Sequence, residues 1–116
     1  MTDAEMAGRR LSDLENLLLL AVGRLGEDAY GAAIQDELED RAGVIPSIGT
    51  IYVTLVRLEG QGLVESEVGD PINVRGGKGK RLFSLTPRGL DALRVTRGSL
   101  QRMWDGLDDL FGPDHA

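Results

Sequence analysis

The feature that most constrains the fold is an apolar repeat near the C-terminal end of the chain. Large apolar side chains recur at alternating steps of three and four residues between Leu90 and Phe111, with one charged interruption at Arg97. This spacing places them on one side of an α-helix, in the heptad pattern by which helices pair. The segment begins with Thr-Pro, a good cap followed by a good first helical residue, so we expect one helix over residues 87–111.

This predicted helix is too long for the rest of the chain to cover. About 25 residues at 1.5 Å each span about 37 Å, whereas the whole chain has 116 residues. We therefore expect a homodimer in which two copies of the helix pair, rather than packing of the helix on its own domain, and we expect the leucine-rich first helix to join the interface. The expected interface residues are Leu90, Leu93, Leu100, Met103, Trp104, Leu107 and Phe111.

The preceding segments predict three short helices and a hairpin. Ser12 has the capping-box spacing to Glu15 and begins the first helix, a second follows the turn at residues 26–31, and Ser47 is a candidate N-cap for the third. Residues 63–68 and 80–85 have the composition of two strands joined by a long glycine-rich tip. The chain is therefore expected to be mainly α with a small β-hairpin.

The third helix has two different faces when its residues are projected at 100° each. The face expected to be buried holds Ile48, Ile51, Tyr52, Leu55, Leu58 and Gly62. The opposite face lacks acidic residues although the chain carries a net charge of −6, and it holds Thr50, Val53, Thr54, Arg57 and Gln61.

Basic residues gather in the hairpin that follows. Arg75, Lys78, Lys80 and Arg81 lie in a stretch, residues 71–90, that contains no acid. The negative net charge taken alone disfavours nucleic acid, but a local basic cluster is what decides such binding. A helix with a polar face followed by a basic hairpin is the arrangement of a helix-turn-helix with a wing, so we expect contact with double-stranded DNA.

These arguments give a winged helix-turn-helix followed by a long C-terminal dimerisation helix. We divide the chain into a flexible N-terminal arm (1–11), a winged-helix DNA-binding domain (12–86), the dimerisation helix (87–111) and a tail (112–116). Two expected contacts have a second role: Ser47 as a helix cap, and Tyr52 as a core residue whose hydroxyl reaches the surface. The expected DNA-binding residues are Ser47, Gly49, Thr50, Tyr52, Val53, Thr54, Arg57, Arg75, Lys78, Lys80 and Arg81.

Several segments resemble those of the PadR family of transcriptional regulators. They are LLLLA at 17–21, AYG at 29–31, SIGTIY at 47–52, LVRL at 55–58, GLV at 62–64, KRLFSLTP at 80–87 and Gly89. The resemblance covers about residues 12 to 110 and implies a dimeric winged-helix repressor without enzyme activity. One departure is leucine before Phe83, where the family often has two aromatic residues, and it affects only the packing of the hairpin.

We therefore expect a cytoplasmic, sequence-specific repressor that binds a palindromic operator as a homodimer. Two alternatives stay open: a winged helix used for protein contacts, which the acidic second helix favours, and a small-molecule sensor without strong DNA binding. Met103 and Trp104 are candidate residues for an aromatic or cationic effector at the dimer interface. The competing interpretation is that they form a filled hydrophobic contact.

Composition disfavours other classes of protein. There is no cysteine, and the one histidine is His115 in the tail, so we expect no catalytic triad, no metal site and no cofactor. The glycines and lysines at 76–80 lack the spacing of a phosphate-binding loop. The longest apolar run, residues 17–22, is far shorter than the ~20 residues that span a bilayer, and we expect no signal peptide and no membrane partner.

Overall fold

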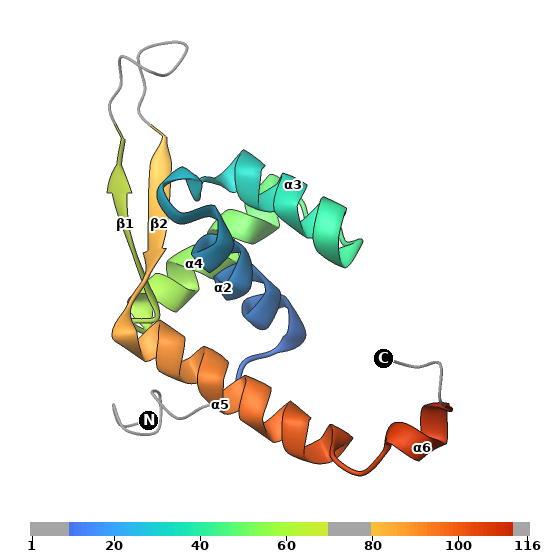
Figure 1. Cartoon of the computed structure of the whole chain (residues 1–116). Helices are drawn as coiled ribbons and strands as arrows, with labels where there is room; N and C mark the ends of the chain where they lie inside the picture. Colours follow the sequence, from blue (N-terminus) through green and yellow to red (C-terminus); the bar gives the residue numbers. More distant parts are fainter. Residues whose placement is uncertain (1–9, 70–79, 113–116) are drawn as a thin grey trace.

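A computed structural model of the chain describes residues 10–69 and 80–112 (Figure 1). Its helices and its hairpin follow one another in the predicted order. The structure confirms the mainly helical fold with a two-stranded antiparallel hairpin. In chain order the elements are α2 (Asp13–Leu25), the 3₁₀ turn η1 (Gly26–Asp28), α3 (Gly31–Ala42), α4 (Ile48–Gly60), β1 (Val64–Val68), β2 (Arg81–Leu85), α5 (Pro87–Trp104) and α6 (Asp108–Phe111).

The helix boundaries follow from local capping. The Ser12 hydroxyl accepts a hydrogen bond from the Glu15 N–H, and the Glu15 carboxylate accepts one from the Ser12 N–H at 2.8 Å. Ser47 and Thr86 accept in the same way from the backbone three residues later, at the starts of α4 and α5. Gly43 ends α3 in the left-handed conformation, which glycine adopts without steric cost. All three predicted N-caps are therefore confirmed.

Helices α2, α3 and α4 enclose a core that the hairpin closes. Leu18, Ile34 and Leu55 are fully buried, and Phe83 of β2 packs into the same core. The two strands pair from Val64↔Leu85 to Val68↔Arg81. On its other edge β2 is tied to the turn after α2, because the Phe83 N–H donates to the Ala29 carbonyl at 2.9 Å. The hairpin is thus fixed on the helices that flank α4.

The last helix is shorter than predicted. Helix α5 ends at Trp104 and a turn separates it from α6, so the continuous helix expected over 87–111 is wrong. Asp105 leaves the helical conformation and Gly106 has φ +85°, which glycine adopts readily. Asp-Gly is a strong turn signal, and the exposed residues around it have no core contact that would oppose the turn. Leu107 and Phe111 therefore do not continue the apolar seam of α5.

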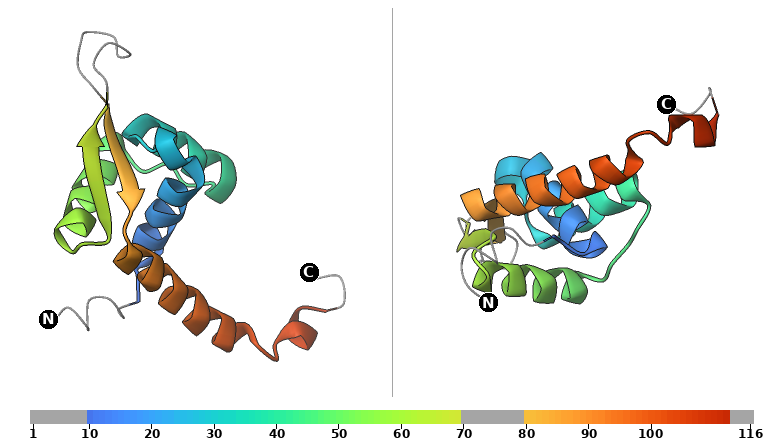
Figure 2. Two further views of the ribbon diagram at one scale, coloured as in Figure 1. Left: turned by 60° about the vertical axis from the view of Figure 1, so that its left-hand side comes forward. Right: turned by 90° about the horizontal axis from the view of Figure 1, so that it is seen from below.

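Helices α4 and α5 lie on opposite sides of α2 (Figure 2, right). Figure 1 shows the end of α5, with α6, projecting away from the core. Within the described parts of the chain, no helix combines the length and apolar character needed to cross a bilayer.

Candidate nucleic-acid interface

Helix α4 exposes most of the side that the projection predicts, but with a different centre. Thr54 lies with Ile51, Leu55 and Leu58 on the buried side and is only 5% exposed, so the expectation that it lies on the exposed face is wrong. Val56, which belongs to neither predicted face, is 54% exposed. The cause is packing, because α2, α3 and β1 contact α4 together and set its rotation. Threonine, small and branched like valine, fits such a core position.

Tyr52 lies at the edge of the exposed side and is half-buried. Its ring centroid is 6.1 Å from that of Phe83, with the planes tilted by 57°. Its ring also fills the space beside Gly31, where a Cβ would lie 2.8 Å from the Tyr52 Cε2. Tyr52 therefore supports α4 against α3 and β2, as expected for a tyrosine packed against the core.

The remaining predicted residues of α4 are exposed. The Ser47 hydroxyl donates to the Thr50 hydroxyl at 2.9 Å, so these two side chains bond to each other at the start of the helix. Gly49 and Val53 are also exposed, and Val53 is 68% exposed. The exposed side of α4 is thus formed by small or apolar residues, with Arg57 at its margin.

Arg57 has a buried partner that sequence reasoning missed. Its Nη2 lies 3.5 Å from the Oε2 of Glu15, a buried carboxylate on α2. The two residues are 42 positions apart, and no local pattern connects them. Because the other Glu15 oxygen accepts the Ser12 N–H, the carboxylate is fixed, and it holds the guanidinium towards α2.

The base of the wing carries two of the predicted basic residues. The Lys80 Nζ lies 3.8 Å from the centroid of the Tyr30 ring, a cation–π contact. The Arg81 Nη2 is 3.7 Å from the Oε1 of Glu59, near the end of α4. Lys80 therefore lies beside the start of α3, and Arg81 lies beside the last turn of α4 itself. Arg75 and Lys78 lie outside the described residues.

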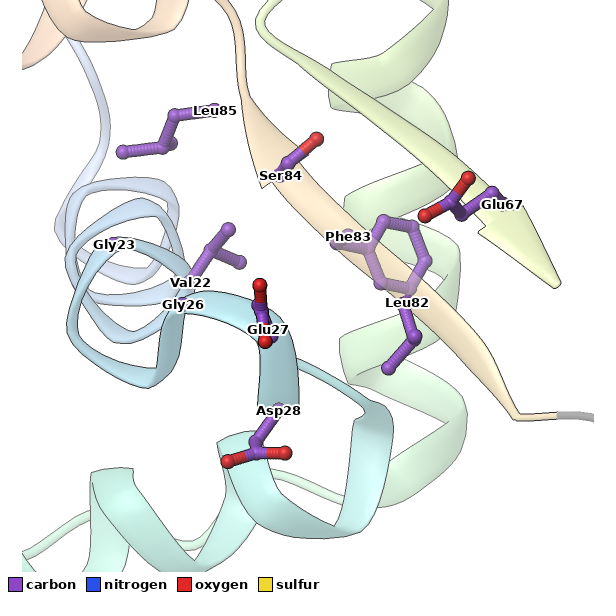
Figure 3. Close-up of a pocket in the computed structure, with 10 residues that line it drawn as sticks. All are labelled: Val22, Gly23, Gly26, Glu27, Asp28, Glu67, Leu82, Phe83, Ser84 and Leu85. Atoms are coloured by element: carbon purple, nitrogen blue, oxygen red, sulfur yellow. The ribbon is translucent and has the colours of Figure 1, made fainter. Parts of the chain in front are cut away.

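Acidic side chains surround a pocket on another side of the hairpin. A pocket of about 670 Å³ lies between the end of α2, η1 and β2, with Phe83 in its wall and Glu27, Asp28 and Glu67 around it (Figure 3). Its carboxylates repel phosphate, so this side of the hairpin is unsuited to DNA. Among the described residues, no three His, Cys, Asp or Glu side chains are grouped as metal ligands would be.

The acidic helix α3 is partly engaged within the molecule. The Glu37 carboxylate accepts hydrogen bonds from the Nε of Arg24 at 2.9 Å and lies 2.7 Å from the Nε of Arg41. The hydrogen bond from Arg24 holds the pKa of the Glu37 carboxyl below its ordinary value. Arg24 links α3 to α2, whereas Arg41 lies on α3 itself, so part of the negative charge of α3 is paired within the molecule.

A second exposed surface runs along α5. Leu90, Leu100, Met103 and Trp104 are exposed, and Leu93 is half-buried. A groove of about 430 Å³ lies between α5 and α2. Its lining residues are Asn16, Leu20, Leu93, Arg94, Arg97, Leu100, Gln101 and Trp104.

The segment after α5 turns back towards this surface. The ring centroids of Phe111 and Trp104 are 5.2 Å apart. Leu107 and Phe111 are exposed, as expected of interface residues, but they reach this surface from α6 and the turn before it.

Comparison with known proteins agrees with this geometry. The model of the PadR-like family of transcriptional regulators matches residues 18–95, which include α3, α4, the hairpin and the first half of α5. This chain belongs to the PadR-like family. It is accordingly a transcriptional regulator of a DNA-binding family and not an enzyme, as the sequence predicts.

Individual proteins similar to this chain cover most of its length. A transcriptional regulator of Mycobacterium tuberculosis (Rv3488) is 38% identical over 89 residues, 77% of either chain. The crystal structure of a PadR family regulator from Eggerthella lenta is 31% identical, with a TM-score of 0.63 and 88% of each chain covered. The complex structure of hsRosR-S4 gives 27% identity and a TM-score of 0.66, covering 89% of this chain and 82% of that one. The winged-helix fold class is therefore confirmed.

Proposed function

We propose that this PadR-like protein represses transcription by binding a palindromic operator as a homodimer. The observation that carries the proposal is the exposed side of α4: none of its exposed residues is acidic in a chain of net charge −6. Lys80 lies beside Tyr30 at the start of α3, and Arg81 pairs with the half-buried Glu59 in the last turn of α4. Helix α4 is the element that would enter the major groove. Because its partner is DNA, the protein would act in the cytoplasm.

In this proposal each part of the chain has one task. Residues 12–86 bind DNA and residues 87–111 pair the subunits, while 1–11 and 112–116 flank them. On α4, Ser47, Gly49, Thr50, Val53 and Arg57 face the DNA. Tyr52 and Thr54 support the helix from the protein side, and Arg75, Lys78, Lys80 and Arg81 of the wing hold phosphates.

The separation of the two surfaces supports this assignment. Since α2 lies between α5 and α4, pairing through α5 and Leu20 leaves both copies of α4 uncovered. In a two-fold dimer the two copies would meet successive major grooves about 34–36 Å apart. Two half-sites of an inverted repeat would then be bound together.

Selection of bound DNA from a random pool tests the function. We expect an inverted repeat whose half-sites are separated by about 10–10.5 base pairs or a multiple. Electrophoretic shift assays at low and moderate salt would then compare the selected and scrambled sequences. If no sequence is preferred at either salt concentration, the protein-interaction alternative is favoured, and a recovered motif without two-fold symmetry would contradict the dimeric mode.

The wing makes a separate prediction about salt. Lys80→Ala, and the double variant with Lys78→Ala, should weaken binding to all sequences about equally. Each lost phosphate contact should also lower the slope of log affinity against log salt by about 0.9. Arg102→Ala removes one positive charge from α5 and is the control, expected to leave the slope unchanged. Unchanged affinity in the double variant would exclude the wing as a phosphate clamp.

The groove at α5 favours a second role as an effector sensor. Trp104, the single tryptophan of the chain, lines this groove, whereas Met103 lies outside its lining. Arg94 and Arg97 also line it, which favours planar neutral or anionic aromatic compounds over cations. A ligand bound there between two chains would change the angle between subunits and therefore the distance between the two α4 helices.

Trp104 fluorescence tests the sensor role. Planar phenolic compounds should change the emission and weaken operator binding. Because linkage is reciprocal, operator DNA should weaken the binding of the compound by the same factor. Cationic compounds of similar size serve as the comparison and should have a smaller effect. If neither class moves either signal, Trp104 serves dimer packing.

A further inference from the structure

The exposed side of α4 has a stripe without hydrogen-bonding side chains. Gly49, Val53, Val56 and Gly60 follow one another at steps of four, three and four, so they form one line along the helix. All four are exposed, and the two valines are 68% and 54% exposed. The middle of the surface proposed to face DNA is therefore apolar.

The polar groups beside this stripe have protein partners. The Thr50 hydroxyl is bonded to Ser47, and the Arg57 guanidinium is held towards Glu15. Thr54 is buried. Burial keeps Thr54 away from the base edges, whereas Thr50 and Arg57 face the DNA beside the stripe and share these protein partners.

An apolar stripe can still distinguish bases in the major groove. Thymine alone among the four bases presents a methyl group there, and apolar side chains contact it. Gly49 and Gly60 add no side chain at the ends of the stripe, and a Cβ at Gly60 would meet open space. The two valines would therefore be the most protruding groups of the stripe.

We propose that Val53 and Val56 determine operator specificity by contacting thymine methyl groups in each half-site. This inference rests on the proposed function and specifies how the same surface reads DNA. DNA suits the surface better than a protein partner does, because the stripe has only two apolar side chains and Arg57 and Arg81 lie near it, Arg81 beside its ion-pair partner Glu59.

Deoxyuridine substitution isolates the methyl groups. Each thymine of the selected operator is replaced in turn by deoxyuridine, which keeps every hydrogen-bonding group and removes only the methyl. At one or two thymines of each half-site, the affinity should fall about three- to four-fold, the effect of losing one buried methyl-sized group. The same change in both half-sites should cost about tenfold.

Variants of the valines then complete a double-mutant cycle. Val53→Ala and Val56→Ala should each weaken binding to the thymine operator and remove the deoxyuridine penalty at one position. Both substitutions are exposed and raise helix propensity, so folding should be retained, as thermal unfolding would verify. Val68→Ala is the matched control, because it alters a valine of similar exposure, 63%, on β1. In this variant each deoxyuridine substitution should still lower the affinity as it does in the unaltered protein.

The outcomes separate this inference from the function on which it rests. Selective DNA binding that no deoxyuridine substitution weakens would overturn the inference and leave the proposed function intact. If the alanine variants still lose affinity with deoxyuridine as the unaltered protein does, other residues contact the methyl groups, and the inference is overturned as well. A change in oligomeric state caused by Val53→Ala or Val56→Ala would identify the stripe as a contact between copies. The absence of any selective DNA binding would overturn both proposals.

Discussion

Replacing Gly89 with alanine is expected to lower the free energy of unfolding by about 3 kcal/mol, at the upper end of the cost of overpacking a core. A Cβ at this position would lie 2.1 Å from the carbonyl oxygen of Leu63 and 3.1 Å from its carbonyl carbon. Such distances cannot be tolerated, and the obstructing atoms belong to the backbone rather than to a flexible side chain. The start of α5 would have to move away from the turn that precedes β1.

The surrounding hydrogen bonds resist this movement. The Leu63 carbonyl accepts the Thr86 N–H at 3.2 Å, and the Leu63 N–H donates to the Leu58 carbonyl at 3.0 Å. The Thr86 hydroxyl also donates to the carbonyl of Gly62, a residue with φ +79°. Displacing Leu63 would therefore disturb the end of α4, the turn and the N-cap of α5 together.

Gly60→Ala is the matched control for this prediction. The same methyl group would meet no atom within 4 Å there, and the residue ends α4. We expect the stability to stay constant or rise by less than about 1 kcal/mol, because alanine favours helix. Urea unfolding at one fixed protein concentration compares the two variants. Equal stability of Gly89→Ala and Gly60→Ala would show that the turn can yield without cost.

In the proposed homodimer, Leu100→Glu is expected to raise the dissociation constant about a hundredfold or more and to abolish tight operator binding. Leu100 is 49% exposed and lines the groove formed with Leu20, Leu93 and Trp104. In a two-fold dimer through this surface, two unpaired carboxylates would enter an apolar interface. Burying an uncompensated charge costs about 3 kcal/mol or more, which corresponds to this change in affinity.

Sedimentation equilibrium measures this effect directly. Val68→Glu makes the same change at an exposed apolar residue of β1 and should leave the dissociation constant unaltered. The Leu100 variant should still unfold cooperatively and bind a single half-site weakly, since α4 is untouched. A Leu100→Glu protein that remains a tight dimer would place the interface on another surface.

Most of the candidate site follows from short patterns in the sequence. Ser47, Thr50, Val53 and Arg57 lie on the exposed side of α4 or at its margin, as expected from capping and periodicity, and Gly49, from the segment that resembles the PadR family, lies there too. Val56 was outside both predicted faces, although it occupies a stripe position at a simple helical step from Val53. A helical projection centred on the most buried residues of α4 would have placed Val56 on the exposed side. The sequence alone does not show which residues are the most buried.

Local structure and family membership can be inferred from the amino-acid sequence without any tertiary contact. Ser12, Ser47 and Thr86 satisfy backbone N–H groups within three residues of themselves, so these capping hydrogen bonds are local, although Thr86 also bonds to Gly62 and Leu63. Tertiary packing decided the rest. Three neighbouring elements fix the rotation of α4 and turn Thr54 inward, because burial depends on where neighbours lie and not on residue polarity alone. Glu15 reaches Arg57 only once α2 and α4 are packed. The seam of α5 ends at Asp105 because, among residues 10–69 and 80–112, no core contact there opposes an Asp-Gly turn.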